Sequence, residues 1–403
     1  MTEKNFDNLY NFSKEPYKDS PAADRSTSRI INQKALLDII YNSKGVSKTA
    51  LATMLKLSKP AVSRNVADLI SMGLVVEKGE GEASKYGGRK PTMLYFNKTH
   101  RYIASLELSL KQPVCAIGDL KYNILRLRKI DIARSVSPEE KKQCIAQVFD
   151  NMLEELSIPL EKLGLIVISQ PGIIGYDNEV YYIESIHHPW ASIGLKEHLQ
   201  NHFSTPVLLE NDVRLAAIGE MNMGFDKQIQ DLIYVSCGIG IGSGVIYKGQ
   251  PLEGCHRAAG ELGAFLLSDG RRLEDVIAME GLLKRITALY AENGYEIKDL
   301  SFEQVVEKSL VGDTLVNQAL KEIGQILGQF LNNCCVMLDI PTVIFGGDYI
   351  KLGPALFESI EETMMQSFLP IRQKVLKSGL KEAAGICGGF VVGKNEILQK
   401  ELK

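Results

Sequence analysis

Residues 46–76 read VSKTALATMLKLSKPAVSRNVADLISMGLVV, and they constrain the fold of the N-terminal part more than any other segment. Two short helices with apolar patterning are separated by a tight turn. Ser47 and Ser58 stand at N-cap positions, and Pro60 lies in a first turn, where proline removes no helical hydrogen bond. Apolar residues recur every three to four positions, which places them on one buried face of each helix. This pattern predicts a helix-turn-helix.

The opposite face of the second helix carries small residues and one arginine, so it can enter a DNA major groove without steric obstruction. An ordinary helical hairpin can share this composition, and charge distinguishes the two. Residues 25–98 carry 13 Lys and Arg against 5 Asp and Glu, a net of +8, whereas the whole chain carries 46 against 49. A basic module on an acidic protein is typical of phosphate binding. We predict DNA contacts from Lys59, Ser63, Arg64 and Asn65.

A β-wing is predicted directly after the hairpin. Strands at 74–78 and 92–96 flank the charged, glycine-rich loop GEGEASKYGGRK. Lys85, Arg89 and Lys90 lie at the tip of this loop, where they are expected to reach phosphates or the minor groove. Residues 25–98 are therefore predicted to form a winged helix-turn-helix domain that binds double-stranded DNA, preceded by a polar tail at 1–24.

The segment 99–403 alternates strands and helices from His100 onward, which indicates an α/β domain. No run approaches the ~18–20 apolar residues of a membrane span, and the polar N-terminus does not resemble a signal peptide. The seven cysteines show neither CxxC nor zinc-site spacing. These features predict a cytoplasmic protein with no membrane partner.

Two carboxylate-bearing segments are candidates for ligand binding. Asn211-Asp212 follows an apolar strand and opens a helix, the position where α/β folds place ligand groups. Asparagine can donate and accept hydrogen bonds and aspartate can accept them, so the pair can bind adjacent sugar hydroxyls. Capping of the helix by Asp212 is the alternative. Glu261 lies among small residues in GCHRAAGELGAF, and a surface position in a turn is the alternative there.

The order of the motifs SQPGIIG, HHPWASIGLKEHL, ENDVRLAAIGE, GIGIGSGVIYKG, GCHRAAGELG and IPTVIFGGD resembles the ROK family, which comprises bacterial sugar kinases and repressors. The resemblance covers about residues 100–395, and the winged module with GGRKP resembles that of ROK repressors. It implies a two-lobed, actin-like ATPase fold with a ligand cleft between the lobes. Residue by residue, it implies sugar-binding roles for Asn211, Asp212, Glu261, Glu274 and His188.

Two departures from the family pattern bear on activity. ROK kinases have an Asp-x-Gly-Gly-Thr phosphate loop, whereas this chain reads Glu107-Leu108-Ser109-Leu110. Phosphoryl transfer depends on positioning and charge neutralisation, so neither kinase activity nor ATP binding is expected. Ala264 replaces the zinc-binding histidine of the family and residues 268–272 replace its cysteine loop, so no zinc is expected.

Together these features predict a DNA-binding repressor of carbohydrate-utilisation genes whose non-catalytic domain senses a sugar or a sugar derivative. A homodimer or homotetramer would bind an inverted-repeat operator, because two-fold protein symmetry matches paired DNA half-sites. Two alternatives remain at this point. One is a repressor controlled by a phosphotransferase-system protein, and the other is an active ATP-dependent sugar kinase with a DNA-binding domain.

Overall fold

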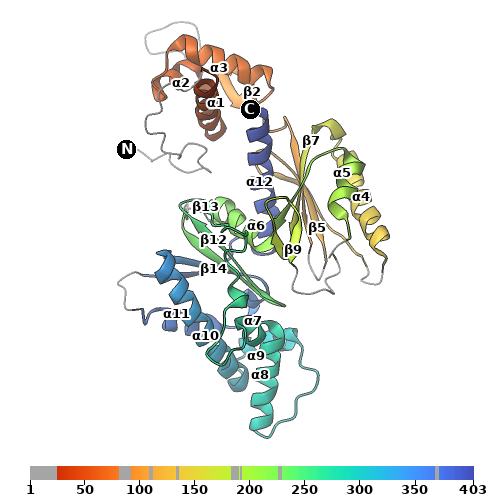
Figure 1. The fold of residues 1–403 in the computed structure, drawn as a ribbon, viewed down its shortest axis with the longest axis vertical. Helices are drawn as coiled ribbons and strands as arrows, with labels where there is room; N and C mark the ends of the chain where they lie inside the picture. The colour runs from red at the N-terminus through yellow and green to blue at the C-terminus, as the bar shows by residue number, and fades with distance from the viewer. Residues whose placement is uncertain are drawn as a thin grey trace.

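A winged module at the N-terminus is followed by two α/β lobes (Figure 1). The two lobes each contain one five-stranded sheet, and this architecture confirms the predicted fold class. Among the described helices, none combines the length and apolarity that crossing a membrane requires. The computed structural model describes residues 25–80, 92–108, 112–132, 136–182, 190, 193–225, 229–367 and 372–403.

The winged module packs its helices against a small antiparallel sheet in the order β1-β3-β2. The Oγ atoms of Ser47 and Ser58 accept backbone N–H groups at 3.2 and 3.3 Å, so both predicted caps are confirmed. The two predicted wing strands are also confirmed. The elements are α1 (Arg25–Asn42), β1 (Val46–Ser47), α2 (Lys48–Met54), α3 (Lys59–Ser71), β2 (Val75–Glu80) and β3 (Thr92–Phe96).

The sheet of the first lobe has the order β10-β7-β4-β5-β6, in which β10, β7 and β4 are parallel. Helices α4 and α5 cover one face, and α12 (Ala384–Glu401) covers the other. A two-stranded ribbon, β8 with β9, follows β7. The elements are β4 (Tyr102–Glu107), β5 (Val114–Asp119), β6 (Ile124–Lys129), α4 (Pro138–Glu155), β7 (Leu163–Gln170), β8 (Ile173–Ile174), β9 (Val180–Tyr182), α5 (Leu195–Phe203) and β10 (Val207–Asn211).

The sheet of the second lobe has the order β13-β12-β11-β14-β15. Its outer face packs on α7 to α11 and forms the largest apolar core of the described chain. The strands are β11 (Leu232–Cys237), β12 (Ile241–Tyr247), β13 (Gln250–Pro251), β14 (Thr342–Gly346) and β15 (Lys374–Lys377). The helices are α7 (Leu273–Ile277), α8 (Met279–Glu292), α9 (Phe302–Leu310), α10 (Thr314–Leu338) and α11 (Pro354–Met364), with a short 3-10 turn η3 (Leu262–Ala264) before α7.

Helices α6 (Asp212–Gly219) and α12 lie between the two sheets and join the lobes. They approach so closely that a Cβ atom at Gly388 would lie 1.9 Å from the carbonyl oxygen of Leu215, which is why glycine is needed there. The far end of α12 extends to the winged module (Figure 1), where Leu398 and Leu402 belong to the same apolar core as Leu36 of α1. One helix therefore contacts both the lobes and the DNA-binding module.

Candidate DNA-reading surface and sugar cleft

Helix α3 presents its predicted reading face to solvent. Val62, Val66 and Leu69 are fully buried against α1 and the wing, which fixes the rotation of the helix. Lys59, Ser63 and Arg64 are exposed on the opposite side. An exposed face of small and basic side chains on a capped second helix is the geometry with which helix-turn-helix proteins enter the major groove.

Asn65 must be removed from the predicted DNA contacts. Its side chain is only 7 % exposed, and its Nδ2 donates a hydrogen bond of 2.9 Å to the carbonyl oxygen of Ala61. The residue lies beside Val66 on the buried flank of the helix, so its amide binds the backbone of its own helix instead of facing outward.

Asp68 holds α3 against α1, a role that the sequence did not reveal. Its carboxylate accepts a 3.0 Å hydrogen bond from Gln33 and forms a 2.8 Å ion pair with Arg29. Lys48 of α2 and Glu77 of β2 form a further ion pair of 2.7 Å.

The tip of the wing, with Lys85, Arg89 and Lys90, lies outside the described residues, as does His188.

The carboxyl ends of β4, β7 and β10 bring polar side chains to one edge of the first sheet. Register places Glu107 beside Ser169 and Asn211 beside Gln170. In parallel sheets this edge is where ligands bind. The sequence-predicted pair Asn211-Asp212 therefore lies at the sheet edge where ligands bind in α/β folds.

Asn211, and not Asp212, caps helix α6. Its Oδ1 accepts the N–H of Arg214 at 2.8 Å, and its Nδ2 donates to the carbonyl oxygen of Gly172 at 2.9 Å. Asp212 occupies the first helical position, where its Oδ1 accepts the N–H of Val213 at 2.9 Å. Burial raises the pKa of Asp212 above its ordinary value. The helix cap is thus satisfied without Asp212, which leaves this carboxylate available for another role.

Glu274 and Glu261 lie on the second lobe. Glu274 Oε1 accepts the backbone N–H of Ile241 at 3.0 Å, so this carboxylate positions the start of β12. Glu261 is exposed at the start of η3, directly after Gly260, whose φ of +96° suits glycine. Asn211 Nδ2 also donates to Asp212 Oδ1 at 3.3 Å, so these two side chains are brought together, whereas Glu274 is bound to the glycine-rich hairpin.

Glu107 connects the carboxyl edge of the first sheet to α12. Its carboxylate accepts the backbone N–H of Ile386 in the first turn of α12, and a Cβ atom at Gly385 would lie 2.7 Å from its Oε2. Burial, followed by the negative charge of Asp212, raises the pKa of Glu107 to about 7. Helix N-termini favour a carboxylate, so Glu107 serves as a cap supplied by another element.

A buried ion-pair network lies beside the Asn-Asp pair and was missed by the sequence analysis. Glu210 is 6 % exposed and pairs with Arg214 at 2.7 Å and with Arg257. Arg257 pairs with Glu253 at 3.1 Å as well. Glu210 and Arg214 stand four residues apart on either side of the Asn-Asp pair in VLLENDVRLAAIG, and this i,i+4 spacing of opposite charges was the available signal.

The junction between α12 and the winged module is built around Lys394. This side chain is 5 % exposed, and its Nζ lies 4.6 Å from the centroid of the Tyr41 ring and 5.1 Å from that of Tyr122. Burial lowers the pKa of Lys394 to about 8. Nearby, Glu401 accepts from His100 at 2.8 Å, which ties the last turn of α12 to the segment between the domains.

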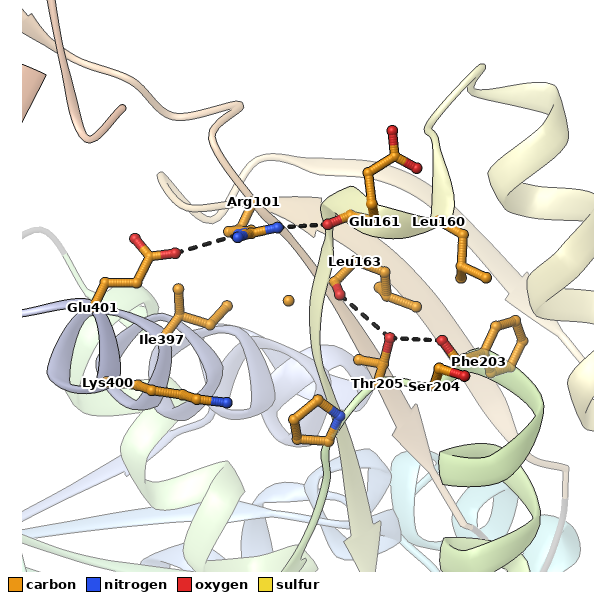
Figure 2. A pocket seen from close by; sticks show the side chains of 12 residues that line it. Arg101, Leu160, Glu161, Leu163, Phe203, Ser204, Thr205, Ile397, Lys400 and Glu401 are labelled. Atoms are coloured by element: carbon orange, nitrogen blue, oxygen red, sulfur yellow. Dashed lines mark hydrogen bonds and ion pairs between the residues drawn. The ribbon is translucent and has the colours of Figure 1, made fainter. Parts of the chain in front are cut away.

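A pocket of about 700 Å³ lies at the opposite ends of the same strands, and none of the predicted sugar ligands lines it (Figure 2). Arg101 in its wall pairs with Glu401 at 3.2 Å and donates to the carbonyl oxygen of Glu161. Thr205 Oγ1 lies 3.3 Å from the carbonyl oxygen of Leu163. Because these polar groups already bind one another, the candidate sugar site remains at the carboxyl edge of the sheet.

Fold and site together define a winged helix-turn-helix protein with a two-lobed, actin-like sugar kinase domain. Residues 104–396 match the model of the ROK family, and residues 28–85 match that of the MarR family. The chain belongs to the ROK family.

Its curated relatives include repressors of similar length. The xylose repressor of Bacillus subtilis (strain 168) is 28 % identical over 380 residues, covering 91 % of this chain and 95 % of the relative. That of Caldicellulosiruptor bescii is 27 % identical, with 91 % and 96 % covered.

Among solved structures, a ROK family transcriptional regulator that is a homologue of the E. coli MLC protein superposes with a TM-score of 0.78. It is 21 % identical, with 93 % and 99 % of the two chains covered. A ROK family glucokinase from Streptomyces griseus, solved with glucose and AMPPNP, superposes with a TM-score of 0.58 at 18 % identity, with 72 % and 98 % covered. These likenesses show the fold, including that of both lobes.

Proposed function

We propose that this protein is a DNA-binding transcriptional repressor of carbohydrate-utilisation genes whose operator affinity is set by a sugar bound between the lobes. The observation that carries the proposal is the exposed reading face of α3 on a module that shares a core with the sugar kinase-like domain through α12. The relatives named xylose repressor make xylose the first effector to test. They favour a repressor over the kinase and protein-partner alternatives.

Lys59, Ser63 and Arg64 are the proposed groove contacts, with Lys85, Arg89 and Lys90 of the wing on flanking phosphates. Two copies of the chain place two α3 helices on half-sites about one helical turn, or a multiple of it, apart, so the operator is an inverted repeat. The symmetry of the operator therefore reports the symmetry of the protein.

Asp212 and Asn211 are the proposed sugar ligands at the carboxyl edge of the first sheet, with Glu261, Glu274 and His188 contributing from the other segments. A sugar that binds one arrangement of the lobes more tightly shifts the protein toward that arrangement, typically by ~1–3 kcal/mol of coupling. Helix α12 carries this shift, because its first turn is capped by Glu107 and its Lys394 lies against the Tyr41 ring of α1.

Catalysis is not part of the proposed function. Glu107 and Leu108 stand where the related kinases have the start of a glycine-rich phosphate loop. The glycines that admit the phosphates in such a loop are absent from Glu107-Leu108-Ser109-Leu110, so a nucleotide phosphate has no cradle there. A coupled assay of ADP release with xylose or glucose is expected to stay at background, and rapid turnover would refute this part of the proposal.

The decisive experiment joins operator binding to calorimetry. Duplexes selected from a random library by the purified protein should be inverted repeats, and xylose should weaken or strengthen their binding in a fluorescence anisotropy titration. Asp212→Ala should lower sugar affinity at least about tenfold, since it removes a buried acceptor. Asp269→Ala changes an exposed carboxylate in the second lobe and is the matched control. Selection of duplexes without repeats, or unchanged sugar affinity in Asp212→Ala, would refute the proposal.

A further inference from the structure

Arg257 is the residue through which the loop between β13 and η3 of the second lobe reaches the first lobe. Its Nη2 pairs with Glu210 at the end of β10, and its Nη1 donates to the carbonyl oxygen of Gly175 at 3.2 Å. Its guanidinium lies 5.4 Å from the centroid of the Tyr176 ring. One side chain thus contacts both the edge strand β10 of the first-lobe sheet and the segment after β8.

Two more hydrogen bonds bind the loop that carries Arg257, one from Tyr176 and one from Arg214. Tyr176 donates its hydroxyl to the carbonyl oxygen of Gly254 at 2.9 Å, in the same loop as Arg257. Arg214 donates to the carbonyl oxygen of Arg257 itself at 2.6 Å. The loop is therefore fixed at two backbone positions as well as by its arginine side chain.

The backbone of Arg257 is strained. Its φ is +55°, a left-handed conformation that side chains other than glycine and asparagine rarely adopt. Such conformations persist where the surroundings determine them, and they cluster at ligand clamps and switch regions. Here the surroundings are a local turn, in which the N–H of Arg257 donates to the carbonyl oxygen of Gly254 at 3.4 Å, and the hydrogen bonds from Tyr176 and Arg214 to the same loop.

The guanidinium also keeps one unused donor. The side chain is 10 % exposed, and among the described residues its buried Nε has no hydrogen-bond partner. Buried donors are nearly always satisfied, so an exception calls for an explanation, and an acceptor oxygen supplied by a ligand is one. The Oε2 of Glu210 binds Arg257 and its Oε1 accepts the backbone N–H of Asn211 at 2.8 Å, so Arg257 lies close to the strand end that carries the proposed sugar ligands.

We propose that Arg257 is the latch of the sugar cleft: it joins the second lobe to the first, and its Nε–H donates to an oxygen of the bound sugar. The inference rests on the proposed function for its sugar-binding part, whereas the interlobe contact is independent of the ligand. Arg257 acts as a positioning residue for Glu210 and as a direct ligand of the effector. Release of the latch admits the sugar, and its closure slows dissociation.

Arg257→Gly is the informative variant, because glycine accepts the left-handed backbone while removing every contact of the side chain. In the sugar-free protein, amide hydrogens of residues 173–176 and 253–260 should exchange at least about tenfold faster than in the wild type, since they lose a mutual constraint. Arg271→Ala removes an exposed arginine of the same lobe and should leave both segments unchanged. Unchanged exchange in Arg257→Gly would overturn the latch.

Calorimetry and stopped-flow binding with xylose test the second part. Arg257→Gly should bind the sugar at least about tenfold more weakly, chiefly through faster dissociation. The sugar concentration that gives half of the change in operator binding should rise by the same factor. Arg257→Lys keeps the charge without the Nε–H and should recover the exchange protection more than the affinity. Wild-type affinity in Arg257→Gly would overturn the ligand role. A wild-type protein that binds no sugar would refute the proposed function and the ligand role, while the exchange experiment would still decide the latch.

Discussion

Replacing Lys394 by methionine is expected to stabilise the protein at neutral pH, although the change removes two cation–π contacts. The ammonium lies between the Tyr41 and Tyr122 rings at the junction of α12 and the winged module. Burial lowers its pKa from 10.5 to about 8, which means that the folded protein disfavours the charged form. Methionine is unbranched and apolar, so it can fill the space left by the lysine stem.

The size of the effect follows from the pKa. One pKa unit corresponds to about 1.36 kcal/mol, so holding Lys394 charged at pH 7 lowers the free energy of unfolding by about 3 kcal/mol. Loss of the cation–π contacts at a desolvated position removes about 2 kcal/mol of stabilisation. Lys394→Met should therefore be more stable than the wild type by about 1 kcal/mol at pH 7.

The direction of this pKa shift determines how the contribution of Lys394 to stability changes with pH. The pKa of Lys394 is lower in the folded than in the unfolded protein, so between about pH 8 and 10.5 the unfolded chain binds more protons and the contribution of Lys394 to stability rises. The difference between the two proteins should thus shift toward the wild type by about 2 kcal/mol between pH 7 and 9.5. Burial raises the pKa of several thiols, among them Cys115 and Cys237, and the difference between variants cancels their shared effect.

Urea denaturation followed by the fluorescence of Trp190, the only tryptophan, measures this difference at the two pH values. Lys400→Met changes an exposed lysine of the same helix and should stay within about 0.5 kcal/mol of the wild type. A Lys394→Met protein that is destabilised at pH 7 by an amount that does not change at pH 9.5 would show that burial does not penalise the ammonium, and the reasoning would fail.

Three further predictions concern the other sites. Glu210→Gln leaves the buried guanidinium of Arg214 without its counter-charge and leaves Arg257 paired with Glu253 alone. It should lower the free energy of unfolding by about 3–5 kcal/mol, measured in the same urea titration, and a loss below about 1 kcal/mol would contradict this. Arg64→Ala should cost about 1–3 kcal/mol and relax the preference at one operator position, as read by repeating the duplex selection; an unchanged preference would argue against α3 as the reading helix. Glu107 binds its proton more tightly in the folded protein, so its contribution to stability falls as pH rises from about 4.5 to 7. Glu107→Gln should therefore lose less stability than the wild type between pH 5 and 7.5, as measured by thermal unfolding. An equal loss in the two proteins would refute the raised pKa of Glu107.

Local chemistry made the reading helix predictable. A serine cap, a first-turn proline and apolar residues at helical spacing determine α3 without reference to distant segments, and the structure has α3 beginning directly after Ser58. Asn65 shows the limit of this reasoning, because a polar residue on the flank of a buried face can turn inward and donate to the backbone of its own helix. Side-chain type alone does not reveal that choice.

The cleft was predictable only in part. Asn211-Asp212 stands at the end of a recognisable strand, so its place in the fold follows from the α/β pattern. Arg257 depends on Glu210 and Gly175, which lie 47 and 82 residues away in the sequence and in the other lobe. No local pattern encodes a contact of that kind, and its left-handed backbone is visible only in three dimensions.

The position of α12 explains how a fold shared with kinases can control DNA binding without chemistry at the cleft. Its 18 residues give a rod of about 27 Å from the Glu107 cap to the last turn. A tilt of about 5° at the cleft end displaces the far end by roughly 2 Å over that length. The far end shares a packed core with α1, and packed cores transmit a displacement instead of absorbing it. In a symmetric pair both reading helices would move, so the spacing of the two half-site contacts changes while each winged module stays intact. Effector control then requires only that sugar favours one position of α12, and this is a difference in binding free energy that an inert cleft can supply.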